Sequence, residues 1–236
     1  MENNYFIPFR TSNFKQLKKG NTPLPCVTHF PTPIAENAPD MEDEEKITYI
    51  AERFREIMIC LGLDLEDSSL ARTPERVAKM YVTEVFSGLK EETFPPISVV
   101  DNQFQHSKRG NLVFLKVNFH SFCEHHFVPM NGTAFIAYIP GSKIIGLSKI
   151  PRIVRYFARR PQLQERLTAQ IADALSMLLE TEHVAVSLTA QHFCVMARGI
   201  EDDNSHTTTN VLRGDFEIIP GVQNQFFESI NRGNAK

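Results

Sequence analysis

The order of apolar patterns along the 236-residue chain constrains its fold more than any other feature of the sequence. From residue 44 onward, apolar side chains recur at spacings of three and four, which predicts an amphipathic helix that ends near Gly62. Thr73 and Pro74 predict the start of a second helix, which we expect to continue to about Leu89. Two helices therefore precede the rest of the fold as a lead-in.

Strand-like alternation begins after this lead-in and is interrupted by further helical patterns. Because the helices and strands are grouped rather than strictly alternating, we predict an α+β fold and not a doubly wound sheet. No internal repeat or heptad array is visible. The expected strands cover 113–119, 133–139, 184–190 and part of 207–218, and the expected helices start near Ser148, run over 163–179 and close the C-terminus.

The N-terminal segment differs from the rest of the chain. Residues 1–43 contain six prolines and lead into an acidic run at 42–45, a pattern that disfavours long helices and central strands. We predict an extended, mobile tail with no role of its own, and an arm that packs on a partner is the alternative. Residues 44–236 are expected to form a single domain, with the helical lead-in at 44–90 and the core at 97–236.

Charge and composition exclude several classes of protein. The chain has 25 basic and 28 acidic residues, and a net charge of -3 argues against a nucleic-acid coat protein. No apolar run approaches the ~20 residues that cross a bilayer, and the first residues lack the apolar core of a signal peptide. The four cysteines are too few and too scattered for a disulfide scaffold. We therefore expect a cytoplasmic protein that binds neither nucleic acid nor membranes.

Two short segments combine cysteine with histidine. Cys123 and His126 are three residues apart, so both side chains can point the same way from a tight turn. His192 and Cys194 are two residues apart and would share one face of a strand. Ordinary packing explains either segment alone. Together they predict a metal site, because thiolate and imidazole are the usual ligands of Zn²⁺.

Three ligands, Cys123, His126 and Cys194, would leave a fourth position for water, as in catalytic zinc sites. Zinc lowers the pKa of such a water to roughly 7, and His125 and His192 would stand beside the metal as groups able to transfer protons. The alternative is a closed structural site without a reactive water. Its fourth ligand would come from His192, His125, Cys26 or Cys60.

Basic side chains suggest an anionic ligand. Lys149 and Arg152 lie at the start of an expected helix, where backbone N–H groups and the helix dipole also favour an anion. Arg198 follows the second Cys/His segment, and Arg76 lies near the start of an earlier helix. Each is most simply a solvated surface charge, but together they could bind phosphate groups.

Gln164 and Glu165 open the helix expected at 163–179. Such a pair is most often an exposed amide and carboxylate. The functional alternative is recognition of guanine, because one carboxylate can accept hydrogen bonds from both N1–H and N2–H of that base. Adenine has a different pattern and would leave the carboxylate unpaired.

The chain resembles the GTP cyclohydrolase I family over about four-fifths of its length, from about residue 45 to near the C-terminus. The segments C-E-H-H, G-L-S-K, Q-E-R-L and H-x-C-x-x-x-R follow one another in the order typical of that family. The longer matching stretches are RTPERVAKMYVTEVFSGL, SFCEHHFVPMNGTAFIAYIP, IIGLSKIPRIVRYFARRPQLQERLTAQI and VAVSLTAQHFCVMARGI.

The resemblance implies a zinc enzyme that opens the guanine ring of GTP, releases formate and forms 7,8-dihydroneopterin triphosphate, the first step of tetrahydrofolate and pterin biosynthesis. It implies the α+β tunnelling fold, with an antiparallel sheet and helices packed on one face, and a homodecamer whose active sites lie between subunits. The implied zinc ligands are Cys123, His126 and Cys194, and the implied acid/base residues are His125 and His192. The implied guanine contacts are Gln164 and Glu165, and the implied triphosphate and ribose contacts are Ser148, Lys149, Arg152, Arg198 and Arg76.

Two features depart from the family pattern. Residues 1–44 match nothing in it, and Pro151 stands in the G-L-S-K-containing segment, where a proline near a helix N-terminus disturbs little. Two other functions remain as hypotheses. One is a catalytically silent nucleotide-binding scaffold with structural zinc, and the other is a tunnelling-fold enzyme that acts on another pterin or a deazapurine.

Overall fold

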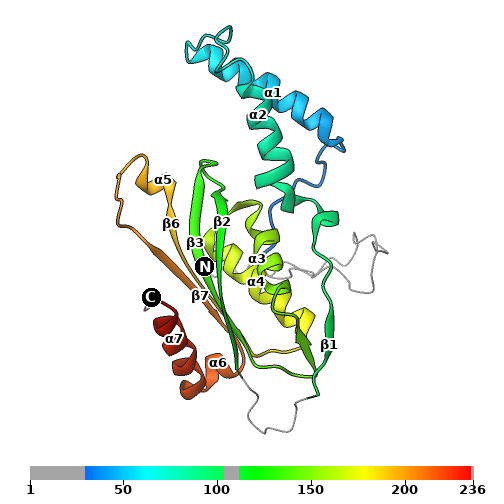
Figure 1. Cartoon of the computed structure of the whole chain (residues 1–236), viewed down its shortest axis with the longest axis vertical. Coiled ribbons are helices and arrows are strands. Elements are labelled where there is room, and N and C mark those ends of the chain that lie inside the picture. The colour runs from blue at the N-terminus through cyan, green and yellow to red at the C-terminus, as the bar shows by residue number, and fades with distance from the viewer. Residues whose placement is uncertain (1–29, 104–111, 235–236) are drawn as a thin grey trace, which may run out of the picture.

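The computed structural model describes residues 30–103 and 112–234, so most of the tail expected at 1–43, including Cys26, lies outside the described residues. A five-stranded sheet forms the centre of the molecule, in the order β5-β2-β3-β6-β7 (Figure 1). All neighbours in it are antiparallel except β2 and β5. Its strands are β2 (Val113–Cys123), β3 (Pro129–Tyr138), β5 (Pro161–Gln162), β6 (Val184–His192) and β7 (Thr207–Leu212), and β1 (Val99–Asp101) pairs separately with β4 (Lys143–Ile145).

Helices cover one face of this sheet along its length. α3 (Lys149–Ala158) and α4 (Gln164–Leu179) lie against it (Figure 1), and their apolar residues join those of β2, β3 and β6 in the main core. The apolar positions that the sequence indicated on α3 are fully buried, among them Ile150, Ile153 and Phe157. Pro151 lies in the first turn of α3, where its missing N–H has no partner within the helix.

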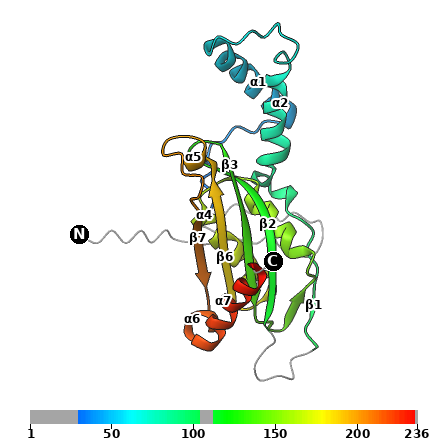
Figure 2. The same cartoon turned by 60° about the vertical axis from the view of Figure 1, so that its left-hand side comes forward.

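A smaller cluster lies on the opposite face of the sheet. α6 (Asp215–Ile218) and α7 (Pro220–Asn234) pack there (Figure 2), and Phe216 and Phe226 contact Phe135 and Ala185. Both faces of β3 and β6 are thus covered, which explains why their residues are buried on either side of the pleat. The predicted α+β class with an antiparallel sheet is confirmed. The C-terminal helices add a second covered face.

The helical lead-in consists of α1 (Asp43–Cys60), which ends next to Gly62 as predicted, and a second helix that is shorter than expected. The predicted continuous helix over 73–89 is wrong. α2 (Thr73–Lys79) passes into the wider π-helical turn η1 (Met80–Val85), whose β-branched residues crowd a regular helix. The strand region expected at 207–218 also ends earlier than predicted. Its first part forms β7, but residues 215–218 form α6.

The lead-in projects beyond the end of the sheet (Figure 1), and α1 packs mainly on α2. Much of the apolar face predicted for α1 is therefore uncovered within one chain. Ala51 and Met58 are buried, whereas Ile57 is 51 % and Leu61 is 71 % exposed. No helix among the described residues is long and apolar enough to cross a membrane.

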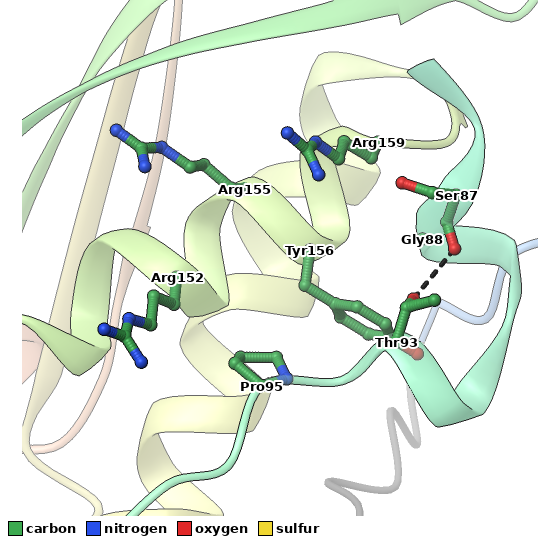
Figure 3. A pocket seen from close by; sticks show the side chains of 8 residues that line it. All are labelled: Ser87, Gly88, Thr93, Pro95, Arg152, Arg155, Tyr156 and Arg159. Carbon is green, nitrogen blue, oxygen red and sulfur yellow. Dashed lines mark hydrogen bonds between the residues drawn. The ribbon is translucent and has the colours of Figure 1, made fainter. Parts of the chain in front are cut away.

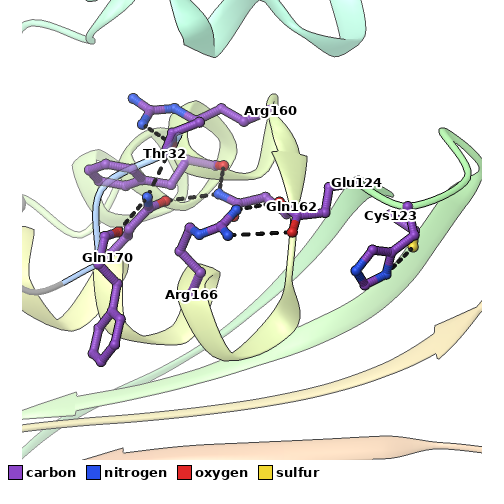
Figure 4. A network of polar contacts seen from close by, with 10 residues as sticks. Thr32, Cys123, Glu124, Arg160, Gln162, Arg166 and Gln170 are labelled. Atoms are coloured by element: carbon purple, nitrogen blue, oxygen red, sulfur yellow. Dashed lines mark hydrogen bonds and ion pairs between the residues drawn. The ribbon is translucent and has the colours of Figure 1, made fainter. Parts of the chain in front are cut away.

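The described end of the N-terminal segment, residues 30–42, has no helix or strand. It is nevertheless attached to the core, because the Oγ1 atom of Thr32 accepts hydrogen bonds from Arg160 at 2.9 Å and Gln170 at 3.2 Å (Figure 4). Gln170 also donates to the carbonyl oxygen of Phe30 at 3.1 Å. This part of the segment is therefore held against α4 and the end of α3.

Gly132 in β3 is required by close packing of the sheet. A Cβ atom there would lie 2.4 Å from the carbonyl oxygen of Thr189 and 2.7 Å from the Cβ of Ala190, both in the neighbouring strand. We expect Gly132→Ala to lower the free energy of unfolding by about 1–3 kcal/mol, because the strands must move apart. Denaturant unfolding measures the effect. Gly221→Ala is the control, since nothing lies within 4 Å of that position, and equal stability of the two variants would contradict the prediction.

Candidate catalytic metal centre

The Cys/His segment at 123–126 forms the tight turn that joins β2 to β3. β2 ends at Cys123, and the turn is closed by hydrogen bonds from Cys123 N to Val128 O and from Phe127 N to Cys123 O, both 2.9 Å. Phe127 has a φ of 52°, which reverses the chain direction toward β3. The turn brings His126 back over Cys123, as the three-residue spacing predicted.

The second segment lies beside this turn because β6 pairs with β3, with His192 opposite Met130. The prediction that His192 and Cys194 share a strand face is wrong. β6 ends at His192, and Cys194 lies in the short helix α5 (Phe193–Met196). This change of backbone direction separates the two side chains, so that Cys194 turns toward Cys123 while His192 faces α4.

Cys123, His126 and Cys194 come together as a possible metal site. One ligand atom from each lies within 4.8 Å of the others. Burial, followed by the neighbouring Cys123 sulfur, raises the pKa of the Cys194 thiol, and Arg198 opposes the shift. Two adjacent thiolates repel each other unless a cation lies between them, so this donor set fits a thiophilic divalent metal such as Zn²⁺.

An ion pair fixes the metal-binding turn to α4. Glu124, between the two ligands of the turn, pairs with Arg166 of α4 through both carboxylate oxygens (Figure 4). The backbone N–H of Glu124 also donates to Gln162 O in β5 at 3.0 Å. Sequence reasoning missed this pair. Glu124 stood inside the recognised C-E-H-H segment, but nothing in the local sequence connected it to Arg166.

The two histidines outside the metal group differ in their surroundings. His125 is exposed, and its Nδ1 atom lies 3.8 Å from the sulfur of Cys123 (Figure 4). The Nε2 atom of His192 lies 2.8 Å from the side-chain oxygen of Gln164. Burial lowers the pKa of His192, and the negative charge of Glu165 opposes that shift. The His125 ring therefore lies next to the metal group, whereas the His192 ring, two residues before Cys194 in the chain, faces α4.

Gln164 and Glu165 have different environments although they are neighbours. Gln164 is only 2 % exposed, and its amide is hydrogen-bonded to His192, to two backbone carbonyls and to Thr209. Glu165 is exposed, and its carboxylate has no hydrogen-bond partner among the residues that the structure describes. Of these two neighbours, Glu165 has the side chain without a hydrogen-bond partner among the described residues, whereas the Gln164 amide is already hydrogen-bonded within the protein.

The basic residues fall into separate groups within one chain. Arg198 lies at the metal group, where its guanidinium is 2.8 Å from His126 Nε2. Ser148 precedes α3, whose far end at Ala158 accepts a hydrogen bond from Ser121 near the metal turn. At about 1.5 Å per helical residue, Ser148 lies about 15 Å from that end.

Arg152 lines a cavity of about 240 Å³ between α3 and the segment that follows η1 (Figure 3). Arg155 and Arg159 line the same cavity and project from the same side of α3 as Arg152. Sequence reasoning missed Arg155 and Arg159. Their spacings of three and seven residues from Arg152 already indicated that all three lie on one face of the helix. Arg76 lies on α2, and Lys149 donates to the carbonyl oxygen of Pro96 at 3.1 Å. A single chain therefore does not gather the predicted phosphate contacts around its own metal group.

The fold and the site together define the class: an α+β protein with a candidate catalytic metal centre at one end of an antiparallel sheet. The sequence profile of GTP cyclohydrolase I matches residues 50–231. A protein named GTP cyclohydrolase 1 from Aeromonas hydrophila is 50 % identical over 202 residues, which are 85 % of this chain and 90 % of that protein. Its namesake from Photobacterium profundum is 53 % identical over 190 residues, 80 % of this chain and 85 % of that protein.

Among solved structures, the apo archaeosine synthase QueF-Like matches with a TM-score of 0.39 and 17 % identity, over 45 % of this chain and 97 % of that one. The sequence relationship is much closer. The chain belongs to the GTP cyclohydrolase I family and is an enzyme, a hydrolase. Its α+β fold is the tunnelling fold that the resemblance implied.

Proposed function

We propose that the protein hydrolyses GTP by opening the guanine ring, with release of formate and formation of 7,8-dihydroneopterin triphosphate, the first step of tetrahydrofolate and pterin biosynthesis. The observation that carries the proposal is the convergence of Cys123, His126 and Cys194, with His125 next to the group and His192 two residues from Cys194 in the chain. When bound by these three residues, Zn²⁺ would supply an activated water for hydrolysis at neutral pH.

The side chains around the metal group can perform the other steps. His125 protonates N7 of the purine as water adds to C8, and His192 supplies a second proton to N9 when the C8–N9 bond breaks and the ring opens. Glu165 accepts hydrogen bonds from N1–H and N2–H of guanine and so selects this base. Ser148, Lys149, Arg152, Arg198 and Arg76 hold the triphosphate and ribose, with Arg155 and Arg159 extending the positive surface around Arg152.

We further propose that the active site is completed between subunits of a homodecamer. Two features support an assembly: the exposed apolar residues of α1, and an open sheet in which, among residues 30–103 and 112–234, β7 pairs only with β6 and β5 covers two residues of β2. Residues 44–236 would act as one domain in each subunit. Light scattering coupled to size-exclusion chromatography tests the decamer, and a monomeric mass would contradict it.

A reducing cytoplasm is the proposed location, because Cys60, Cys123 and Cys194 are free thiols and two of them are needed as metal ligands.

The direct test of the function is to incubate the purified, zinc-loaded protein with GTP. We expect formate and, after oxidation, a fluorescent pterin. The absence of both products, under conditions in which an authentic enzyme of the family forms them, would refute the proposed function.

Glu165→Gln should weaken binding of GTP about 10- to 100-fold, because a charged hydrogen-bond acceptor contributes about 1.5–3 kcal/mol. The amide also presents a donor toward the donors of guanine. Affinity for GTP measured by calorimetry should fall while zinc content stays unchanged. Glu182→Gln, at the other end of α4, is the control. Equal affinity of the two variants would exclude Glu165 from base recognition.

A further inference from the structure

The orientation of the Gln164 side-chain amide is fixed by its surroundings. Its Nε2 atom lies 3.0 Å from the carbonyl oxygen of Leu188 and 3.0 Å from that of Thr207. Carbonyl oxygens only accept hydrogen bonds, so the NH₂ group must face them, and rotation of the amide by 180° would place two pairs of oxygens against each other. The side-chain oxygen therefore has to point to the opposite side.

Hydroxyl groups of α4 and β7 reinforce this orientation. The hydroxyl of Thr168 donates its proton to the backbone carbonyl oxygen of Gln164 at 2.7 Å. In its 2.6 Å contact with the hydroxyl of Thr209, Thr168 must therefore accept. Thr209 then donates to Thr168 and keeps a lone pair for Gln164 Nε2, 3.2 Å away. The two N–H groups of the amide thus serve three acceptors, so one of them is shared, and the chain of contacts connects α4, β6 and β7.

The side-chain oxygen of Gln164 lies 2.8 Å from the Nε2 atom of His192. An amide oxygen cannot donate, so this contact is a hydrogen bond only when Nε2 of His192 carries the proton. A neutral imidazole has one N–H group, and Nδ1 is then the nitrogen with the free lone pair. Gln164 is 2 % exposed, so water has little access to replace the amide in this contact.

We propose that Gln164 is a positioning residue that holds the His192 ring in one orientation with the proton on Nε2, leaving Nδ1 as the atom that exchanges a proton with the substrate. The catalytic part of this assignment rests on the proposed function. It differs from a role in base recognition, because Gln164 would act through His192 and would not contact the guanine. The neighbouring Glu165 would then supply base recognition alone.

Nitrogen-15 NMR of the full-length, zinc-loaded protein with labelled histidine tests the proton position without any activity measurement. The His192 signals are identified by their loss in His192→Gln. We expect the neutral ring to show a protonated Nε2 and an unprotonated Nδ1. A proton on Nδ1 would overturn the proposal. If the protein did not convert GTP, the proposed function would fail while this result still decided the proton position.

Kinetics of Gln164→Met separate positioning from substrate contact. Methionine keeps the volume but removes every hydrogen bond, so we expect zinc content and KM for GTP to be unchanged while kcat falls about 10- to 100-fold, as for other partners that orient a functional histidine. Gln191→Met, one residue from His192 and with a side chain that donates a long hydrogen bond of 3.4 Å to Asp203 O, is the matched control and should keep its kcat. A rise in KM with unchanged kcat would show contact with substrate and overturn the proposal.

Thr209→Val provides a milder change if Gln164→Met does not fold. It removes one acceptor of the amide and the donor to Thr168 but leaves Gln164 in place. A lower kcat together with a shifted His192 nitrogen signal would support the proposal. An unchanged signal and an unchanged kcat would count against it.

Discussion

Cys194→Ser is expected to abolish stoichiometric zinc binding and to lower kcat/KM for GTP by at least about 10³-fold, because the activated water is lost with the metal. Cys194 is one of only three donors in the group, and serine is a poor ligand for Zn²⁺ at neutral pH. The thiol lies at the start of a short helix on the surface of the core, so the fold should persist. Metal analysis and steady-state assays of the same preparation measure both effects.

Cys60→Ser is the matched control for this substitution. Cys60 is an exposed free thiol at the end of α1, away from the metal group. We expect this variant to keep its zinc and its activity. Full zinc occupancy in Cys194→Ser would show that Cys194 is not a ligand, and equal zinc loss in Cys60→Ser would show that the effect is not specific to the site.

His125→Ala is expected to keep zinc but to lose about 10²- to 10⁴-fold in kcat, the usual contribution of a positioned proton donor or acceptor. The ring is exposed beside Cys123 and holds no part of the core, so removing it should leave the turn intact. The closing hydrogen bonds of the turn are made by the backbone and do not involve this side chain. Formate release in single turnovers, with zinc content measured in parallel, reports the ring-opening step.

His120→Ala serves as the control for this variant. His120 is also an exposed histidine and lies in β2, which leads into the turn, and its Nδ1 atom contacts Asn131 at 2.9 Å. Its activity should match that of the unchanged protein. Near-normal turnover in His125→Ala would remove His125 from catalysis, and loss of zinc in that variant would make it a ligand instead.

Much of the fold could be predicted because periodicity and packing agree. The apolar residues of α3 and α4 recur at helical spacing and are buried, and the alternating residues of β6 lie in the sheet as expected. The α-helix predicted through 73–89 is wrong because apolar spacing does not show where a helix passes from α to π geometry, as it does at η1. Residues 215–218 form a helix because Gly214, with a φ of 56°, turns the backbone out of the extended conformation of β7.

The candidate site was predictable where chemistry determines residue type and not where distant segments meet. Cys123, His126 and Cys194 are recognisable because few side chains bind zinc. Glu124 and Arg166, and the chain of contacts from Thr209 through Gln164 to His192, depend on strand order and helix packing that the sequence does not display.

The most direct test of the account follows the fate of carbon C8 in GTP. Protein stripped of metal, and the same protein reloaded with zinc, would be incubated with GTP that carries carbon-14 at C8. We expect radioactive formate only from the reloaded protein, in an amount equal to the pterin formed. Release of label without zinc, or retention of the label in the nucleotide fraction by the zinc-loaded protein, would contradict metal-dependent opening of the guanine ring by this site.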